Sequence, residues 1–264
     1  MSDIMASQDV VLYEELTPHI VLVTLNRPAK LNAVDAELAD ALEAVVRRTE
    51  ADREIRVVIL TSSQDRAFCA GADLGAITSG KGRGIETAAG GFAGITYAAR
   101  TKPWIAVVEG MALGGGCEIA LACDMIAASE NARFGLPEVK RGLLAGAGGV
   151  HRMGAVLPRN IANELIATGD PLDGTRAHHF GLVNRLTPPG GALAAARELA
   201  EAIAVNAPIA VQYSLTAARA SASQPDGFGR AMVAERFAAL RFTEDFKEGP
   251  RAFVEKRAPV WTGR

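Results

Sequence analysis

The chain has 264 residues, of which 49% are apolar and 22% are charged, and its formal net charge at pH 7 is −2. This length and apolar content predict one domain with a sizeable hydrophobic core plus a smaller appendage. The small net charge argues against a global attraction to nucleic acid or to an anionic membrane.

Strands and a helix alternate in the first sixty residues. Residues 10–16 and 19–26 predict two strands that form a hairpin. Asp35 then opens a helix, and residues 56–60, RVVIL, predict a strand buried on both faces. One apolar stripe runs along the helix and consists of Leu38, Ala41, Leu42 and Val45.

A glycine-rich stretch at 75–95 precedes a helix that we expect near 95–101. The stretch is too polar to be core, so we interpret it either as a mobile loop over a cleft or as an ordinary surface loop. Residues 104–113 and 124–129 predict two further apolar strands.

Helical patterns dominate the second half of the chain. One helix starts at Pro158, and another begins at an Asp173 cap and stops at Gly181. The last seventy residues predict about three amphipathic helices and no strand. We therefore expect a β/α core over residues 1–190 and a helical region over residues 191–264.

The repeated strand–turn–helix units predict an α/β protein with right-handed crossovers and mainly parallel strands. Periodicity alone does not distinguish a doubly wound sheet from a spiral stacking of such units.

Several features bear on location and metal binding. The first ten residues, MSDIMASQDV, lack the pattern of a secretory signal, and no apolar run reaches the roughly 18 residues of a membrane span. Cys69, Cys117 and Cys123 have no metal-type spacing and are expected to be reduced and buried. The adjacent His178 and His179 are interpreted as helix-surface residues. These features predict a cytoplasmic protein without a metal site.

Two glycine-rich turns share a design. AGADL at 70–74 and GGGCE at 114–118 each follow a predicted strand, where small residues allow close approach of a ligand. N–H groups at a helix entry lack intrahelical partners, and two of them could converge on an oxygen as an oxyanion hole. The alternative is that these glycines only allow a helix to pack closely on a strand. Neither turn matches a phosphate-binding loop.

Two carboxylates accompany these turns. Glu118 lies in the first turn of a predicted helix, where the helix dipole stabilises negative charge. Glu138 follows Pro137 at the start of a turn. Two carboxylates beside an oxyanion site suit proton abstraction and delivery next to a carbonyl. The alternative for Glu138 is a solvated turn residue.

The sequence resembles the enoyl-CoA hydratase/isomerase (crotonase) superfamily over nearly its whole length. The matching segments are NRPAKLNAVD (26–35), AFCAGADL (67–74), GMALGGGCEIALACD (110–124), ARFGLPEVKRGLLAGAGG (132–149) and EGPRAFVEKRAPVW (248–261). The resemblance implies a crotonase-like (ClpP/crotonase) β/α spiral core and a C-terminal helical trimerisation region. It also implies a homotrimer or a homohexamer built from two trimers, an acyl-CoA thioester substrate, and no metal or redox cofactor, since coenzyme A is part of the substrate.

The resemblance assigns roles to individual residues. By motif match, the backbone N–H groups of Ala72 and Gly115 form the oxyanion hole for the thioester oxygen. The positions that match family contacts to CoA are Ala29, Lys30, Leu31, Ala70, Asp73, Leu74, Phe253 and Lys256. A lysine suits the phosphates of CoA. Without the resemblance, Lys256 would be interpreted as part of a solvated basic helix face.

The two glutamates together resemble a hydratase, which adds water syn across the 2,3 double bond of a trans-2-enoyl-CoA. Glu118 would deprotonate the water that attacks C3, and Glu138 would protonate C2. GGFAG (90–94) and the C-terminal residues resemble the carnitinyl-CoA dehydratase branch, while Leu144 to Ala147 depart from many hydratases beside the acyl site. The alternatives are a crotonobetainyl-CoA hydratase, a Δ3,Δ2-enoyl-CoA isomerase, and a non-catalytic member that binds RNA or another partner.

Overall fold

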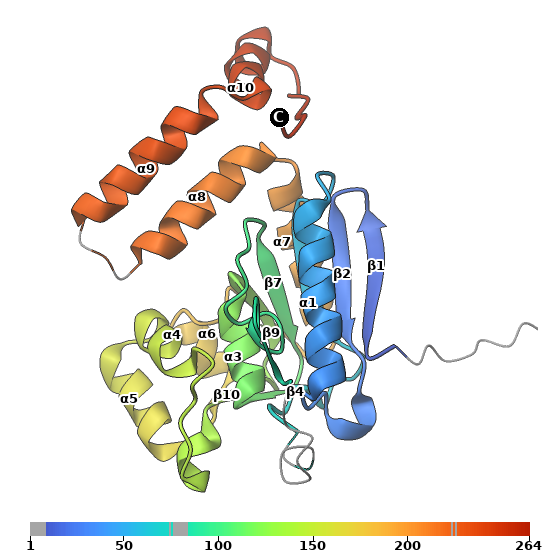
Figure 1. Ribbon diagram of the computed structural model, residues 1–264, viewed down its shortest axis with the longest axis vertical. Coiled ribbons are helices and arrows are strands. Elements are labelled where there is room, and N and C mark those ends of the chain that lie inside the picture. The colour runs from blue at the N-terminus through green and yellow to red at the C-terminus, as the bar shows by residue number, and fades with distance from the viewer. Residues whose placement is uncertain (1–8, 74, 76–83, 223, 225) are drawn as a thin grey trace, which may run out of the picture.

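The computed structural model describes residues 9–73, 75, 84–222, 224 and 226–264 (Figure 1). Two sheets form its centre: a six-stranded large sheet, in the order β1-β2-β3-β7-β9-β12, and a four-stranded small sheet, in the order β11-β10-β8-β4. The strands of the large sheet are β1 (Val11–Thr17), β2 (Ile20–Leu25), β3 (Val57–Ser62), β7 (Trp104–Val108), β9 (Met125–Ser129) and β12 (Arg185–Thr187). Those of the small sheet are β4 (Ala67–Cys69), β8 (Met111–Leu113), β10 (Arg133–Gly135) and β11 (Leu172–Asp173).

The order of the strands resolves the topology that periodicity left open. The successive pairs β3–β4, β7–β8 and β9–β10 each give their first strand to the large sheet and their second to the small sheet. Successive pairs lie next to one another in both sheets, with parallel pairing. A doubly wound protein would place all of these strands in a single sheet. The chain therefore climbs as a spiral, as the resemblance implies.

The expected single strand at 104–113 is wrong, because the chain bends at Gly110 and passes from one sheet to the other. A Cβ atom on Gly110 would lie 2.3 Å from the carbonyl oxygens of both Asp65 and Arg66. Only glycine allows this approach. An apolar run has the same pattern whether the strand is straight or bent, so the sequence did not reveal the bend.

Helices cover both faces of the large sheet. α1 (Ala36–Ala51) begins at Asp35, which accepts a hydrogen bond from the Leu38 N–H at 3.0 Å, and the helix buries Leu38 and Leu42. α7 (Ala192–Ala204) covers the opposite face with a row of buried alanines. Alternate residues of β2 and β3 point to the two helices, as expected of strands buried on both sides.

The segment before β7 also differs from expectation. No helix forms near 95–101 in the described chain; instead a short hairpin, β5 (Glu86–Thr87) and β6 (Gly91–Phe92), is followed by turns. Just before this range, Gly91, Ala93 and Gly94 have φ values of 67°, 55° and 69°, so no right-handed helix passes through these three residues. Most of the 75–83 part of the expected loop lies outside the described residues.

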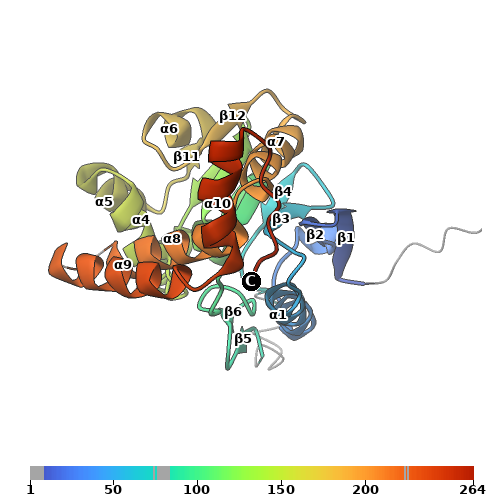
Figure 2. The same ribbon diagram turned by 90° about the horizontal axis from the view of Figure 1, so that it is seen from above.

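Four helices, rather than about three, follow residue 190 in the described chain. α8 (Pro208–Ser221) and α9 (Asp226–Leu240) lie side by side in both views, and α10 (Glu244–Glu255) crosses above them (Figures 1 and 2). The other helical elements are α3 (Gly115–Ala122), α4 (Gly149–Val156), α5 (Arg159–Thr168), α6 (Gly174–His179) and the 3-10 turns η1 (Pro28–Lys30) and η2 (Pro137–Arg141). The predicted starts at Pro158 and Asp173 are confirmed.

Cysteines and histidines lie as expected. All three cysteines are free and buried, and burial raises the pKa of both Cys69 and Cys123 to about 12, so these thiols stay protonated at neutral pH. His178 and His179 lie on the exposed surface of α6. Across the described ranges, no helix has both the length and the apolarity that a membrane crossing requires.

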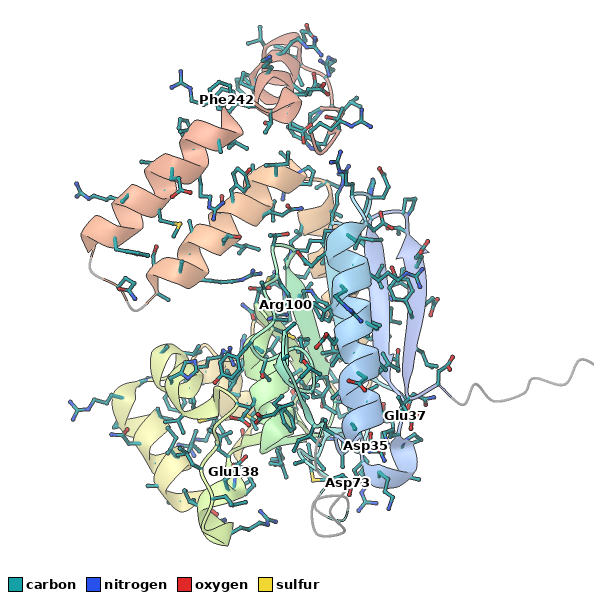
Figure 3. All side chains as sticks on the ribbon, in the orientation of Figure 1. Asp35, Glu37, Asp73, Arg100, Glu138 and Phe242 are labelled. Carbon is teal, nitrogen blue, oxygen red and sulfur yellow. The ribbon has the colours of Figure 1, made fainter. Side chains whose placement is uncertain are left out.

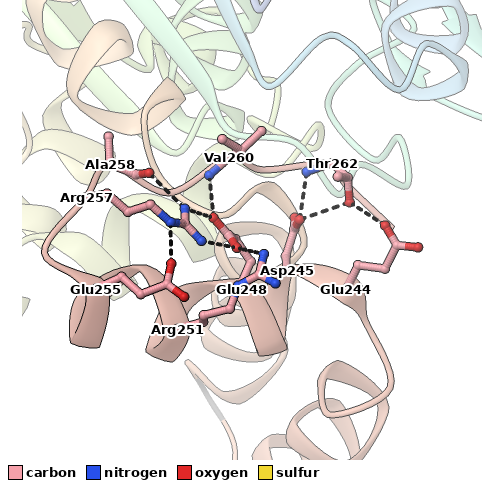
Figure 4. Close-up of polar contacts among 9 residues, drawn as sticks. All are labelled: Glu244, Asp245, Glu248, Arg251, Glu255, Arg257, Ala258, Val260 and Thr262. Carbon is pink, nitrogen blue, oxygen red and sulfur yellow. Dashed lines mark hydrogen bonds and ion pairs between the residues drawn. The ribbon is translucent and has the colours of Figure 1, made fainter.

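The end of the chain folds back along α10 through two buried carboxylates (Figure 4). Glu248 accepts hydrogen bonds from Arg257 Nη1 at 2.5 Å and from the Val260 N–H at 2.9 Å. Asp245 accepts from the N–H groups of Thr262 and Gly263 at 2.7 and 3.0 Å. These contacts tie residues 256–264 to α10.

We expect Glu248→Ala to release this tail. Hydrogen bonds from Arg257, Val260 and Arg251 hold the pKa of Glu248 well below its usual range. A depressed pKa stabilises the folded state above the unfolded carboxyl pKa of about 4.3, and this contribution is lost as the pH falls toward the folded value. Amide hydrogen exchange of residues 257–264 at pH 7 should therefore be faster in Glu248→Ala than in Glu255→Ala, which removes one exposed contact. Equal exchange in the two variants would contradict the prediction.

Candidate active site

Glu118 is buried on the first turn of α3, with 3% of its surface exposed. The residue just before the helix is Gly114, whose φ of 56° favours glycine. The Gly149 N–H donates a 2.9 Å hydrogen bond to Oε1 of Glu118. The helix dipole and this N–H both stabilise the carboxylate, so its burial at this position is tolerated.

Glu138 projects from η2 toward the same helix entry. A Cβ atom on Gly114 would lie 2.9 Å from its Oε1, so the glycine leaves room for this carboxylate. Its Oε2 is buried and has no hydrogen-bond partner among the residues that the structure describes. Both glutamates thus lie at the helix entry, and one oxygen of Glu138 has no partner within the described part of the chain.

Burial raises the pKa of both carboxyls. For Glu118, burial is the largest cause and the charge of Glu138 raises the pKa further, while the Gly149 N–H lowers it. For Glu138, burial again dominates, and Arg141 lowers the pKa. Carboxyls with raised pKa values in one site are suited to exchange protons near neutral pH.

The two predicted oxyanion donors lie on adjoining segments. The Val34 N–H donates to Gly71 O at 2.8 Å and the Asp73 N–H donates to Val34 O at 2.9 Å, so this bridge does not use the Ala72 N–H. Gly115 is the first residue of α3, where an N–H has no intrahelical acceptor. A Cβ atom on Gly71 would lie 3.1 Å from Gly115 N. The geometry therefore brings together the two segments that carry these N–H groups.

The N-terminal residues predicted to contact CoA also gather here. Ala29 and Lys30 lie in η1, and Leu31 follows with a φ of 52°. The Ala70 N–H donates to Leu31 O at 3.0 Å, which joins the two segments. Asp73 lies beside Arg27, with 3.6 Å between its Oδ2 and the guanidinium Nη2. Leu74 lies outside the described residues.

Phe253 and Lys256 are not brought to this group of residues within the chain. They lie at the end of α10, and Phe253 is 86% exposed. Figures 1 and 3 show α10 at the end of the molecule opposite Glu138 and Asp73. Their contact with CoA stays a prediction.

Sequence reasoning gave no role to two residues that contact or neighbour Glu118. One is Gly149, which supplies its N–H, and the other is Arg152, whose charge lowers the pKa of Glu118. Gly149 belongs to the glycine run AGAGG at 145–149, which was the available signal. Arg152 carried no signal, because an arginine in a helix is ordinarily exposed.

Glu118→Gln is expected to stabilise the folded protein at pH 8. A carboxyl with a raised folded pKa contributes stability that is present below the unfolded value of about 4.3 and lost as the pH rises through the folded value. The variant should therefore melt above the wild type at pH 8, and the difference should shrink toward pH 4. Calorimetric melting at both pH values measures this. A variant that melts below the wild type at pH 8 would contradict it.

The fold and these motifs define a protein class. A family model described as enoyl-CoA hydratase/isomerase matches residues 15–264. The chain belongs to this family, and its α/β spiral core with C-terminal helices is the crotonase fold.

Individual relatives carry two kinds of name. A carnitinyl-CoA dehydratase of Salmonella typhi is 40% identical over 250 residues, which cover 93% of this chain and 95% of that protein. The solved structure of an enoyl-CoA hydratase from Mycobacterium tuberculosis is 42% identical, covers 97% of this chain and 100% of that one, and has a TM-score of 0.92. The solved structure of a carnitinyl-CoA hydratase from Mycobacterium avium is also 42% identical. The match covers 98% of this chain and 100% of that one, with a TM-score of 0.78.

Proposed function

We propose that the protein is an enoyl-CoA hydratase that adds water syn across the 2,3 double bond of a trans-2-enoyl-CoA and yields a 3-hydroxyacyl-CoA. The placement of both Glu118 and Glu138 at the entry to α3 carries this proposal. An addition of water needs one group to remove a proton and another to deliver one. The family and the names of the relatives support a hydro-lyase.

In this mechanism the water lies between the two carboxyl groups. Ionised Glu118, oriented by the Gly149 N–H, accepts a proton from the water while its oxygen bonds to C3. Protonated Glu138 donates its proton to C2, so the double bond gains one oxygen and one hydrogen on the same face. Because both carboxyls contact one water, their titrations should couple.

The thioester oxygen gains negative charge as C3 is attacked. We assign the N–H groups of Ala72 and Gly115 to this oxygen, which the entry to α3 would also stabilise through its dipole. Ala29 to Leu31, Ala70 and Asp73 would hold the CoA portion. No step calls for a metal or a redox cofactor.

A second candidate is hydration of crotonobetainyl-CoA, and the two carnitinyl-CoA relatives favour it. The same two glutamates would perform the same addition on a cationic acyl group. A single carboxylate suffices for a Δ3,Δ2-isomerase, so the pair of glutamates favours hydration over isomerisation.

Loss of the conjugated thioester absorbance tests the proposal. Crotonyl-CoA, longer trans-2-enoyl-CoAs and crotonobetainyl-CoA would be compared by kcat/KM at one pH. Preference for neutral acyl groups supports the first candidate, and preference for crotonobetainyl-CoA supports the second. A folded protein that hydrates none of them would overturn both, and a 3-enoyl-CoA assay and a salt-dependent RNA gel shift would then test the isomerase and the binding protein.

We also propose that the C-terminal helices join copies of the chain into a homotrimer or a dimer of trimers. Large apolar side chains that are exposed in this region support an interface; they include Val205, Phe242 and Phe253. Light scattering after size exclusion distinguishes these assemblies from a monomer.

A further inference from the structure

Arg152 is a half-buried arginine that cross-links two loops beside Glu118. It lies on the first turn of α4, where its Nη1 donates to Ala147 O at 3.2 Å and its Nη2 donates to Thr96 O at 2.5 Å. Its guanidinium lies over the ring of Tyr97, 5.2 Å from the centroid. One side chain therefore joins the 145–149 turn to the segment that follows β6.

The same two segments are joined a second time. Tyr97 donates its hydroxyl proton to Gly146 O at 3.1 Å. Gly148 has a φ of 107°, and a Cβ atom on it would lie 2.0 Å from Nη1 of Arg152. The turn thus has a glycine where the guanidinium approaches the backbone.

This turn is the one that contacts the carboxylate of Glu118. Gly149 follows directly, and its N–H donates to Oε1 of Glu118. A Cβ atom on Gly149 would lie 3.0 Å from both Cγ and Oε1 of that glutamate, so the backbone and the carboxylate are in close contact. A shift of a few tenths of an ångström in the turn would change this hydrogen bond.

We propose that Arg152 is a positioning residue for Glu118: it holds the glycine turn in place so that the Gly149 N–H meets the carboxylate, and it provides a fixed positive charge beside it. The proposal rests on the proposed function, in which Glu118 is the base. Arg152 acts through the turn and through its charge, and need not touch the substrate.

The charges around Glu118 show how Arg152 affects its pKa. Glu118 faces Glu138 from η2, Arg152 from α4 and the thiol of Cys117 on its own helix. Burial and Glu138 raise the pKa of Glu118, while the N–H groups of Gly149 and Ala147 and the charge of Arg152 lower it. Arg152 in turn faces Tyr97, Arg100 and Cys123. Arg152 is thus the one cation that offsets the raised pKa of Glu118 in the described site.

Two variants separate the charge from the cross-link. Arg152→Met removes both, so the acid limb of the pH profile of kcat/KM should move to higher pH, with kcat/KM at pH 6 about tenfold lower than in the wild type. Arg152→Lys keeps a charge but lacks the planar fork that bonds two carbonyls. It should retain the acid limb of the wild type with a reduced kcat.

The matched control is Arg56→Met. Arg56 also bonds two backbone carbonyls, those of Ala204 and Trp261, but does so at the C-terminal tail. It should leave the pH profile unchanged. An acid limb in Arg152→Met that superimposes on the wild type, or an Arg152→Lys variant with unchanged kcat, would overturn the proposal.

A second readout does not depend on turnover. In protein labelled with [δ-13C]glutamate, the Glu118 carboxyl resonance is assigned by its loss in Glu118→Gln. Its titration midpoint should be higher in Arg152→Met than in the wild type. Equal midpoints would overturn the positioning role. A wild type that hydrates no enoyl-CoA, with shifted midpoints in the variant, would instead overturn the proposed function alone.

Discussion

Replacing Glu118 with glutamine is expected to lower kcat for crotonyl-CoA hydration by about 10²- to 10⁴-fold, and Glu138→Gln should have an effect of the same order. Glutamine keeps the shape of the side chain but can neither accept the water proton nor deliver one to C2. KM should change little, because neither carboxylate is assigned to the binding of CoA. The decrease in conjugated thioester absorbance measures both parameters.

The double variant distinguishes the possible roles of the pair. If the two carboxyls act on one water, the double substitution should cost little more than the worse single substitution, because either change already disables the addition. Glu164→Gln, at an exposed position on α5, is the matched control and should retain the activity of the wild type. Loss of turnover in only one of the two active-site variants would point to a single-carboxylate reaction such as double-bond isomerisation.

The sequence predicted those parts of the fold that depend on local chemistry. Asp35 and Asp173 cap their helices through side-chain oxygens, as expected of an aspartate at the start of a helical segment. The buried strand at 56–60 also appears as β3. These elements are determined by neighbours within a few residues, which a sequence displays directly.

The predictions from sequence were wrong where contacts with distant segments determine the backbone conformation. The apolar run at 104–113 gave no sign of its bend, because the bend depends on the carbonyls of Asp65 and Arg66 approaching Gly110. Within the described ranges no helix forms near 95–101, and the chain enters this stretch through a turn with positive φ at Ala93 and Gly94. A Cβ atom on Gly94 would lie 2.5 Å from Ala39 O in α1, so the turn depends on a tertiary contact. Such contacts join residues far apart in the sequence.

The candidate site shows the same division. Glu118, Glu138 and the two glycine turns could be identified as chemistry-bearing motifs, and the structure brings them to one helix entry. The role of Arg152 could not be identified, because it depends on hydrogen bonds from its guanidinium to the carbonyls of Ala147 and Thr96. Such a placement leaves no pattern in the sequence.

Gly116→Ala is expected to damage both stability and turnover, because Gly116 is where α3 meets β4. A Cβ atom at this position would lie 2.0 Å from the carbonyl oxygen of Cys69 and 2.6 Å from its carbonyl carbon. Both atoms belong to the backbone, so the helix and the strand must separate. Overpacking of this kind costs about 1–3 kcal/mol of the free energy of unfolding.

The loss of turnover follows from what the two elements carry. The Ala72 N–H comes shortly after β4, and Gly115 begins α3, so separating the elements would move the two proposed oxyanion donors apart. Loss of one such donor lowers kcat by about 10²- to 10³-fold, and Gly116→Ala should approach this range with a smaller change in KM.

The control is Gly154→Ala in α4, where a Cβ atom would meet nothing within 4 Å. This variant should keep the kcat of the wild type. Its free energy of unfolding should rise by up to about 1 kcal/mol, because alanine is favoured over glycine inside a helix. Chemical denaturation measures the free energy of unfolding of both variants, and crotonyl-CoA kinetics measure their kcat and KM. A wild-type kcat in Gly116→Ala would mean that the contact between β4 and α3 does not set the position of the donors.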